Sequence, residues 1–219
     1  MEHLQVLGIV AIAAWLAVLA AMAQLLRQWR PDQAEWSRKV VHLGAGLVLP
    51  MAWATDISRT IALAAAVLAT ILVAVNQYTR LLPGLESINR RSYGTVAYGL
   101  SILLLLWWGW PQRAAIVVAA GLIMAFGDGL AGILGPAYPS PGWSVLGQRK
   151  SLLGTACVAL LATGVGWTLF GEHLSLTQLL MLGVAAAALE QISVLGVDNL
   201  LLPLGTAALL NQWLSTWRG

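Results

Sequence analysis

An aspartate set among glycines is the residue of this sequence that points most directly to chemistry. Asp128 follows the apolar run Ala114–Gly127 and precedes a second apolar run, Leu130–Leu134. A carboxylate costs about 2.5–3.5 kcal/mol at the centre of a membrane span, so a charge placed there is a functional hypothesis by default. The glycines on either side, Gly127 and Gly129, allow a metal ion or a substrate to approach the backbone closely.

A basic group follows Asp128 along the chain. Arg149, Lys150 and Ser151 stand at the start of the apolar run Leu152–Phe170. A lysine and a serine at the start of a helix can bind phosphate, because the free backbone N–H groups and the helix macrodipole favour anions there. The structural alternative is that Arg149 and Lys150 only anchor the topology of the chain in the membrane.

Other polar residues also lie beside apolar runs. Lys39 and His42 open one run three residues apart, so they would lie on neighbouring faces of a helix. Glu190 closes another run, and Asp198 with Asn199 opens the last. The alternative for His42 is an ordinary structural histidine, and the alternative for Asp198 and Asn199 is a cap of the last helix. Together with Asp128, these carboxylates predict a divalent-metal site.

The composition is that of an integral membrane protein. The 219 residues are 59% hydrophobic and only 10% charged, with a mean hydropathy of +0.78, whereas soluble domains average about 25% charged residues. Helices are the expected spanning form, because lipid offers backbone polar groups no partner except each other. The long apolar runs lack the alternation of a membrane β-barrel.

Eight apolar runs approach the roughly 20 residues that a helix needs to cross a bilayer. They are Leu4–Leu26, Val40–Ala54, Ile57–Val75, Thr95–Trp110, Ala114–Leu134, Leu152–Phe170, Leu176–Ile192 and Leu200–Leu214. The second and the last are short, and seven spans result if one run is re-entrant. We therefore predict an all-α, polytopic transmembrane helical bundle of seven to eight spans, with residues 1–219 forming one integral-membrane domain.

The basic residues predict the orientation of the chain. Nine of the twelve fall in the loops after spans one, three and five: Arg27, Arg30, Arg38, Lys39, Arg80, Arg90, Arg91, Arg149 and Lys150. The positive-inside rule places these loops in the cytoplasm and the N-terminus outside. The polar residues near Asp128 then share the cytoplasmic face, which predicts a site for a phosphorylated ligand and a divalent metal.

Three other binding motifs are excluded. The segment Gly127–Gly132 matches G-x-G-x-x-G, but a dinucleotide site needs a preceding strand, and here the flanks are membrane helix. The alternative for these glycines is close helix packing. A P-loop needs a lysine directly after its second glycine, whereas Gln148 follows Gly147. Nucleic-acid binding has no support, because the basic residues belong to short membrane loops.

Taken together, these segments resemble the polyprenol kinase family of membrane lipid kinases, which includes phytol kinases, farnesol kinases and the more distant dolichol kinases. The matching segments are Arg38-Lys39-Val40-Val41-His42, Tyr93-Gly94-Thr95-Val96, Gly127-Asp128-Gly129-Leu130-Ala131 with Gly135, Lys150-Ser151 with Gly154, and Glu190 followed by Asp198-Asn199 and Pro203. The chain departs from the family pattern at Gly132, where many members carry a second aspartate. It also departs after Gly135, where a Pro-rich loop replaces a basic stretch.

The resemblance implies transfer of a γ-phosphate, typically from CTP, to the hydroxyl group of phytol, geranylgeraniol or farnesol. ATP or another nucleoside triphosphate is the alternative donor. The resemblance also implies three sets of residues: Asp128, Lys39 and His42 for catalysis; Lys150, Ser151, Arg149, Gly127, Gly129, Gly135 and Arg91 for the nucleotide; and Asp128, Glu190, Asp198 and Asn199 for Mg²⁺. The partners are then the lipid bilayer, the isoprenoid alcohol and the nucleotide.

Three rival functions remain at this stage. One is a non-catalytic membrane scaffold, which leaves the shared location of the polar residues unexplained. A cytidylyltransferase that makes CDP-diacylglycerol shares the aspartate-glycine-lysine core, but it usually ends in a D-R-x-D signature, which Asp198-Asn199-Leu200 does not supply. A transporter using Asp128 and Glu190 would predict inverted repeats, which the sequence does not show. The prenol, the nucleotide, the general base and the oligomeric state stay open.

Overall fold

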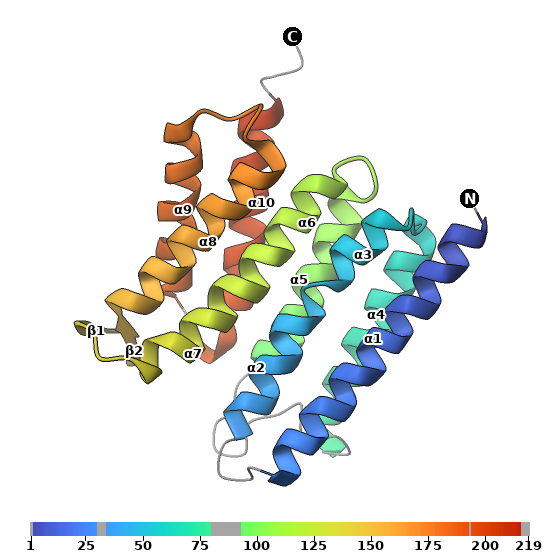
Figure 1. Cartoon of the computed structure of the whole chain (residues 1–219), viewed down its shortest axis with the longest axis horizontal. Coiled ribbons are helices and arrows are strands. Elements are labelled where there is room, and N and C mark those ends of the chain that lie inside the picture. The colour runs from blue at the N-terminus through green and yellow to red at the C-terminus, as the bar shows by residue number, and fades with distance from the viewer. Residues whose placement is uncertain (1, 30–33, 80–92, 193, 216–219) are drawn as a thin grey trace.

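Long runs of alanine, leucine and valine form helices in this protein, as shown by a computed structural model that describes residues 2–29, 34–79, 93–192 and 194–215. The elements, in chain order, are α1 Glu2–Trp29, α2 Ala34–Ala45, α3 Val48–Ala54, α4 Arg59–Thr79, α5 Gly94–Gly109, α6 Ala114–Leu122, the π-helical turn η3 Ile123–Asp128, α7 Gly129–Ala137, β1 Gly142–Val145, β2 Gln148–Ser151, α8 Leu152–Phe170, α9 Leu176–Glu190, the 3₁₀ turn η4 Val194–Gly196 and α10 Asp198–Ser215. Figure 1 shows the helices as one bundle.

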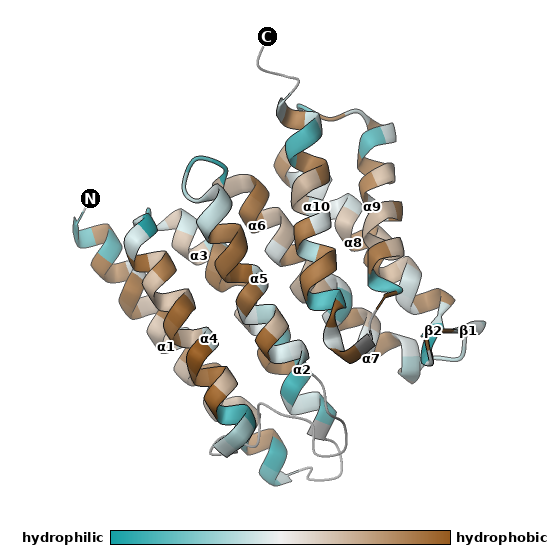
Figure 2. Ribbon diagram, turned by 180° about the vertical axis from the view of Figure 1, so that it is seen from behind, coloured by the Kyte–Doolittle hydropathy of each residue, from teal (hydrophilic) through white to brown (hydrophobic). Residues whose placement is uncertain are grey.

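The helices fit a membrane protein. Within the described residues, four are long and apolar enough to cross a bilayer: Glu2–Trp29, Arg59–Thr79, Ala114–Ala137 and Leu152–Phe170. The prediction of an all-α bundle is confirmed, whereas the count of seven to eight spans stays a prediction. Figure 2 shows apolar residues along the middle of the helices and hydrophilic residues near their ends.

The second predicted span differs from the structure. The chain between Val40 and Ala54 forms the end of α2 and the short α3 instead of one helix. The break lies at Gly46, whose backbone N–H donates to Leu43 O at 3.2 Å in a tight turn. Gly46 also packs against Ala125 and Phe126. The break between α2 and α3 therefore lies where Gly46 packs closely against the turn η3. The hydropathy of the sequence does not reveal this break.

The segment Ala114–Ala137 forms the centre of the bundle. Figure 1 shows α6 running between α8 and α10 on one side and α3 and α5 on the other, and α6 contacts each of these helices. Val117, Ala119 and Met124 are fully buried in the core. The π-helical turn η3 interrupts this helix and ends at Asp128. Such turns are frequent at functional sites, because one extra residue re-aims the side chains that follow.

A β-hairpin precedes α8. Its strands pair antiparallel, with Gly142 opposite Ser151 and Trp143 opposite Lys150. Leu146 and Gly147 form the turn with φ of 49° and 77°, the positive values that match the twist of a two-residue hairpin. Ser151 ends β2 and caps α8, since its Oγ accepts from the backbone N–H of Gly154 at 3.2 Å.

Candidate active site

The polar residues meet at the end of the bundle where α9 ends and α10 begins. A cavity of about 710 Å³ opens there between α2, η3, α7, the hairpin, α8, α9 and α10. Its charged and amide-bearing lining consists of Arg38, Lys39, Asp128, Gln148, Arg149, Lys150, Glu190, Asp198 and Asn199. Nine of the predicted site residues therefore line this one cavity: Lys39, Asp128, Gly135, Arg149, Lys150, Ser151, Glu190, Asp198 and Asn199.

Three carboxylates form the centre of the site. Asp128, Glu190 and Asp198 each offer one oxygen, and these oxygens all lie within 4.8 Å of one another. Asp128 ends the π-helical turn, Glu190 ends α9 and Asp198 begins α10, so three element ends position the group. Glu190 and Asp198 are buried. Close, buried carboxylates repel each other unless cations lie among them.

Two buried lysines partly balance these charges. Lys39 Nζ donates to Asp128 Oδ2 at 3.2 Å and to Asp128 O at 3.2 Å. Lys150 Nζ donates to Glu190 Oε1 and, at 2.6 Å, to Glu190 O. Each lysine thus holds both the side chain and the main chain of one carboxylate residue. With all three carboxylates ionised, the two ammonium groups leave this cluster one negative charge.

Asp198 and Asn199 fit the rim of a cation site. Asp198, which lies outside the predicted span Leu200–Leu214, has its pKa raised to about 7 by burial and by the negative charge of Asp128. The Asn199 N–H donates to Asp198 Oδ1 at 3.1 Å at the start of α10. Asn199 Oδ1 is buried and has no hydrogen-bond partner among the described residues. Carboxylate and amide oxygens are the ligands that Mg²⁺ and Ca²⁺ take in proteins, so the residues present fit a hard divalent cation.

His42 contacts Asp128 and is not part of the cavity lining. Its Nε2 lies 3.4 Å from Asp128 Oδ2 and 3.5 Å from Met124 O. The ring edge of Tyr98 packs against the imidazole with ring centroids 4.8 Å apart, and the Tyr98 hydroxyl donates to His42 O at 3.4 Å. This placement suits a residue that orients the Asp128 carboxylate.

Gly132 accounts for the position of Lys39. A Cβ atom on Gly132 would lie 2.6 Å from Lys39 Cε, a distance at which the end of the lysine side chain must shift. The position at which the sequence lacks the family's second aspartate is therefore the space through which Lys39 reaches Asp128.

The predicted nucleotide residues fall into two groups. Gly135, Arg149, Lys150 and Ser151 line the cavity, and a Cβ on Gly135 would lie 2.8 Å from Ser151 Oγ. Two glycines lie away from the cavity and serve helix packing: a Cβ on Gly127 would meet Val158 at 3.5 Å, and one on Gly129 would meet Leu43 Cγ at 3.0 Å. Arg91 lies outside the described residues.

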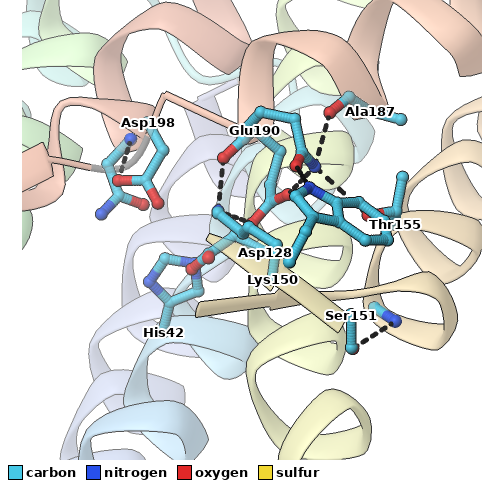
Figure 3. A network of polar contacts seen from close by, with 12 residues as sticks. His42, Asp128, Lys150, Ser151, Thr155, Ala187, Glu190 and Asp198 are labelled. Carbon is cyan, nitrogen blue, oxygen red and sulfur yellow. Dashed lines mark hydrogen bonds and ion pairs between the residues drawn. The ribbon is translucent and has the colours of Figure 1, made fainter. Parts of the chain in front are cut away.

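Three site residues were not predicted from the sequence: Trp143, Thr155 and Gln191. Gln191 Nε2 donates to Glu190 Oε2 at 3.1 Å and to Thr155 Oγ1 at 3.2 Å. The Trp143 indole N–H donates to Gln191 Oε1 at 3.0 Å. Figure 3 shows this network beside Asp128 and Lys150. In the sequence, the one sign of this network is the polar amide of Gln191 directly after Glu190, at the end of an apolar run.

Comparisons with known proteins give one informative match. A protein of Synechocystis sp. named phytol kinase is 35% identical over 213 residues, which cover 94% of this chain and 91% of that protein. No protein-family model matches the chain, and no solved structure matches it.

Proposed function

Because the chain belongs to the polyprenol kinase family, we propose that it transfers the γ-phosphate of CTP to the hydroxyl group of an isoprenoid alcohol such as phytol. It is a phosphotransferase with an alcohol acceptor, and a kinase needs a nucleotide donor. The observation that carries the proposal is the cavity in which Asp128, Glu190 and Asp198 lie together with Lys39 and Lys150. Phosphoryl transfer depends mainly on positioning and on neutralising charge, and this set of side chains can do both.

The three carboxylates form the proposed metal site. Asp128, Glu190, Asp198 and the free Asn199 oxygen would hold Mg²⁺. When bound, the ion neutralises charge on the transferring phosphate. Without it, the carboxylates would repel a triphosphate from the cavity.

The two lysines would bind the phosphates of the nucleotide. Lys39 and Lys150 both line the cavity, and each is paired with a carboxylate of the metal cluster. The carboxylate oxygens would hold a divalent cation, and the ammonium groups of Lys39 and Lys150 would then turn to the phosphates of the nucleotide. Ser151 and Arg149 line the same cavity beside Lys150 and would contact the phosphate chain.

The chemical step is a displacement at phosphorus. The alcohol oxygen forms a bond to the γ-phosphorus, and the bond from that phosphorus to the β,γ-bridging oxygen breaks. CDP leaves with the bridging oxygen, and the alcohol proton passes to a carboxylate of the cluster. His42 contacts Asp128 from outside the cavity and orients the Asp128 carboxylate.

The membrane supplies the acceptor. In this proposal the active site faces the cytoplasm, the N-terminus lies outside, and the shorter helices complete a bundle of seven to eight spans within one domain, residues 1–219. The placement of the basic residues supports this orientation. The isoprenoid tail would lie among the helices with its hydroxyl at the cavity.

A substrate panel tests the proposal. Purified protein is incubated with Mg²⁺, labelled CTP or ATP, and either phytol, geranylgeraniol, farnesol or diacylglycerol. We expect a labelled prenyl monophosphate with at least one prenol and a higher rate with CTP than with ATP. A labelled CDP-lipid from diacylglycerol, without any prenyl phosphate, would replace the kinase by a cytidylyltransferase.

A further inference from the structure

We propose that Gln191 is a positioning residue that fixes the Glu190 carboxylate and thereby sets the affinity of the site for its divalent cation. The proposal rests on the proposed function for the role of Glu190. Gln191 does not line the cavity, so its effect on the cation passes through Glu190.

The contacts of Glu190 are divided between two neighbours. Lys150 binds Oε1, and Gln191 Nε2 donates to Oε2 at 3.1 Å. A carboxylate held at both oxygens cannot rotate about its last bond without losing a contact. When Lys150 turns toward a phosphate, Gln191 is the remaining side chain among the described residues that holds Glu190 in place. Residues that orient metal ligands in this way typically contribute about 10- to 100-fold to metal affinity.

The orientation of the Gln191 amide follows from its partners. An indole N–H only donates, so the Gln191 oxygen must face Trp143, at 3.0 Å. The amide nitrogen then faces three acceptors: Glu190 Oε2, Thr155 Oγ1 at 3.2 Å and Ala187 O at 3.4 Å. The network therefore requires an amide at residue 191, because it needs a donor and an acceptor on one side chain.

The same contacts attach the hairpin to the metal cluster. Trp143 stands directly opposite Lys150 in the hairpin, and directly opposite residues project to the same side of a sheet. The two side chains bind consecutive residues, since Trp143 reaches Gln191 and Lys150 reaches Glu190. Thr155 adds the first turns of α8. Gln191 thus ties the phosphate side of the cavity to a metal ligand.

The test measures cation binding directly. Full-length protein in detergent is titrated with Mn²⁺ alone and bound ion is followed by electron paramagnetic resonance, for wild type and Gln191→Leu. We expect Gln191→Leu to bind Mn²⁺ about 10- to 100-fold more weakly and to need correspondingly more Mg²⁺ for half-maximal kinase activity. Its KM for the prenol should stay unchanged.

Gln178→Leu is the matched control. Gln178 lies in the first turn of α9, whereas Gln191 follows the last residue of that helix, and Gln178 completes a capping box with Ser175. Its loss should lower the melting temperature and leave Mn²⁺ affinity unchanged. Wild-type Mn²⁺ affinity in folded Gln191→Leu, or equal loss of affinity in both variants, contradicts the proposal.

Trp143→Phe covers the case in which Gln191→Leu does not fold. This change keeps an aromatic ring and removes the indole N–H that fixes the amide. It should weaken Mn²⁺ binding several-fold in the same direction; unchanged affinity contradicts the proposal. These measurements distinguish a failure of the positioning role from a failure of the kinase proposal. A wild type that binds Mn²⁺ but phosphorylates no prenol refutes the kinase, whereas a kinase whose cation affinity ignores Gln191 refutes the positioning role.

Discussion

Lys39 Nζ lies 3.2 Å from both the carboxylate Oδ2 and the main-chain oxygen of Asp128. The lysine comes from α2 and the aspartate from the π-helical turn in the centre of the bundle. Lys39 reaches Asp128 by passing over Gly132, which has no side chain to block it. The geometry of the site therefore depends on all three residues.

Gly132→Ala should displace Lys39, because the added methyl group would lie 2.6 Å from Lys39 Cε. Misplacing a catalytic group by about 1 Å lowers rates on the order of 100-fold. We expect kcat/KM for the nucleotide to fall by about 10- to 100-fold, measured in initial-rate assays at saturating prenol. Gly164→Ala is the control, since nothing lies within 4 Å of a Cβ there. Equal kinetics in wild type and Gly132→Ala would refute the dependence of Lys39 on Gly132.

Each carboxylate of the cluster should be needed for activity. Asp128→Asn, Glu190→Gln and Asp198→Asn should each lower kcat by about 100- to 1000-fold, the usual effect of removing one charge-stabilising group. Glu172→Gln, an exposed carboxylate in the loop between α8 and α9, should leave kcat unchanged. Wild-type turnover in Asp128→Asn would remove the metal cluster from the mechanism.

Variants of the Lys150–Glu190 pair should affect stability and catalysis differently. Lys150→Met leaves Glu190 buried without its cation, and removing one partner of a buried pair typically destabilises a protein by about 3–5 kcal/mol. We expect a lower melting temperature for Lys150→Met in detergent. The double variant Lys150→Met with Glu190→Gln should recover most of that loss while activity stays absent. If the double variant is the less stable of the two, the pair is not what holds the hairpin to α9.

Cation and nucleotide should bind cooperatively. Lys39 and Lys150 already neutralise two of the three carboxylates, so a cation alone must displace ammonium groups that would each keep only a main-chain oxygen as partner among the described residues. A nucleotide offers them its phosphates. We expect CDP to tighten Mn²⁺ binding by about 5- to 150-fold, the range of ordinary coupling between sites, measured by calorimetry. Independent binding would contradict the exchange of partners by the lysines.

The helices and their membrane character were predictable, because the alanine- and leucine-rich runs carry a strong compositional signal. The grouping of Asp128, Lys39, Glu190 and Asp198 was also predictable, because the predicted topology brings them to one membrane face. The break between α2 and α3 was not, because it depends on the contact of Gly46 with the central helix.

The hairpin and its contacts lay beyond the sequence signals. Two strands of four residues with a turn at Leu146 and Gly147 carry too little periodicity to be recognised. Lys150 therefore lies in a strand, two residues before the start of α8, and its pairing with Glu190 is a tertiary contact that no spacing indicates. The roles of Gly127 and Gly129 in helix packing likewise depend on neighbours far away in the sequence.

The fate of the γ-phosphate tests the central claim most directly. Purified protein, phytol and Mg²⁺ are incubated in parallel with CTP labelled at the γ-phosphorus and CTP labelled at the α-phosphorus, for wild type and Asp128→Asn. The account predicts γ-label in phytyl monophosphate, α-label in CDP, and neither product with Asp128→Asn. Transfer of the α-label to lipid with release of pyrophosphate, or undiminished γ-transfer by Asp128→Asn, would contradict it.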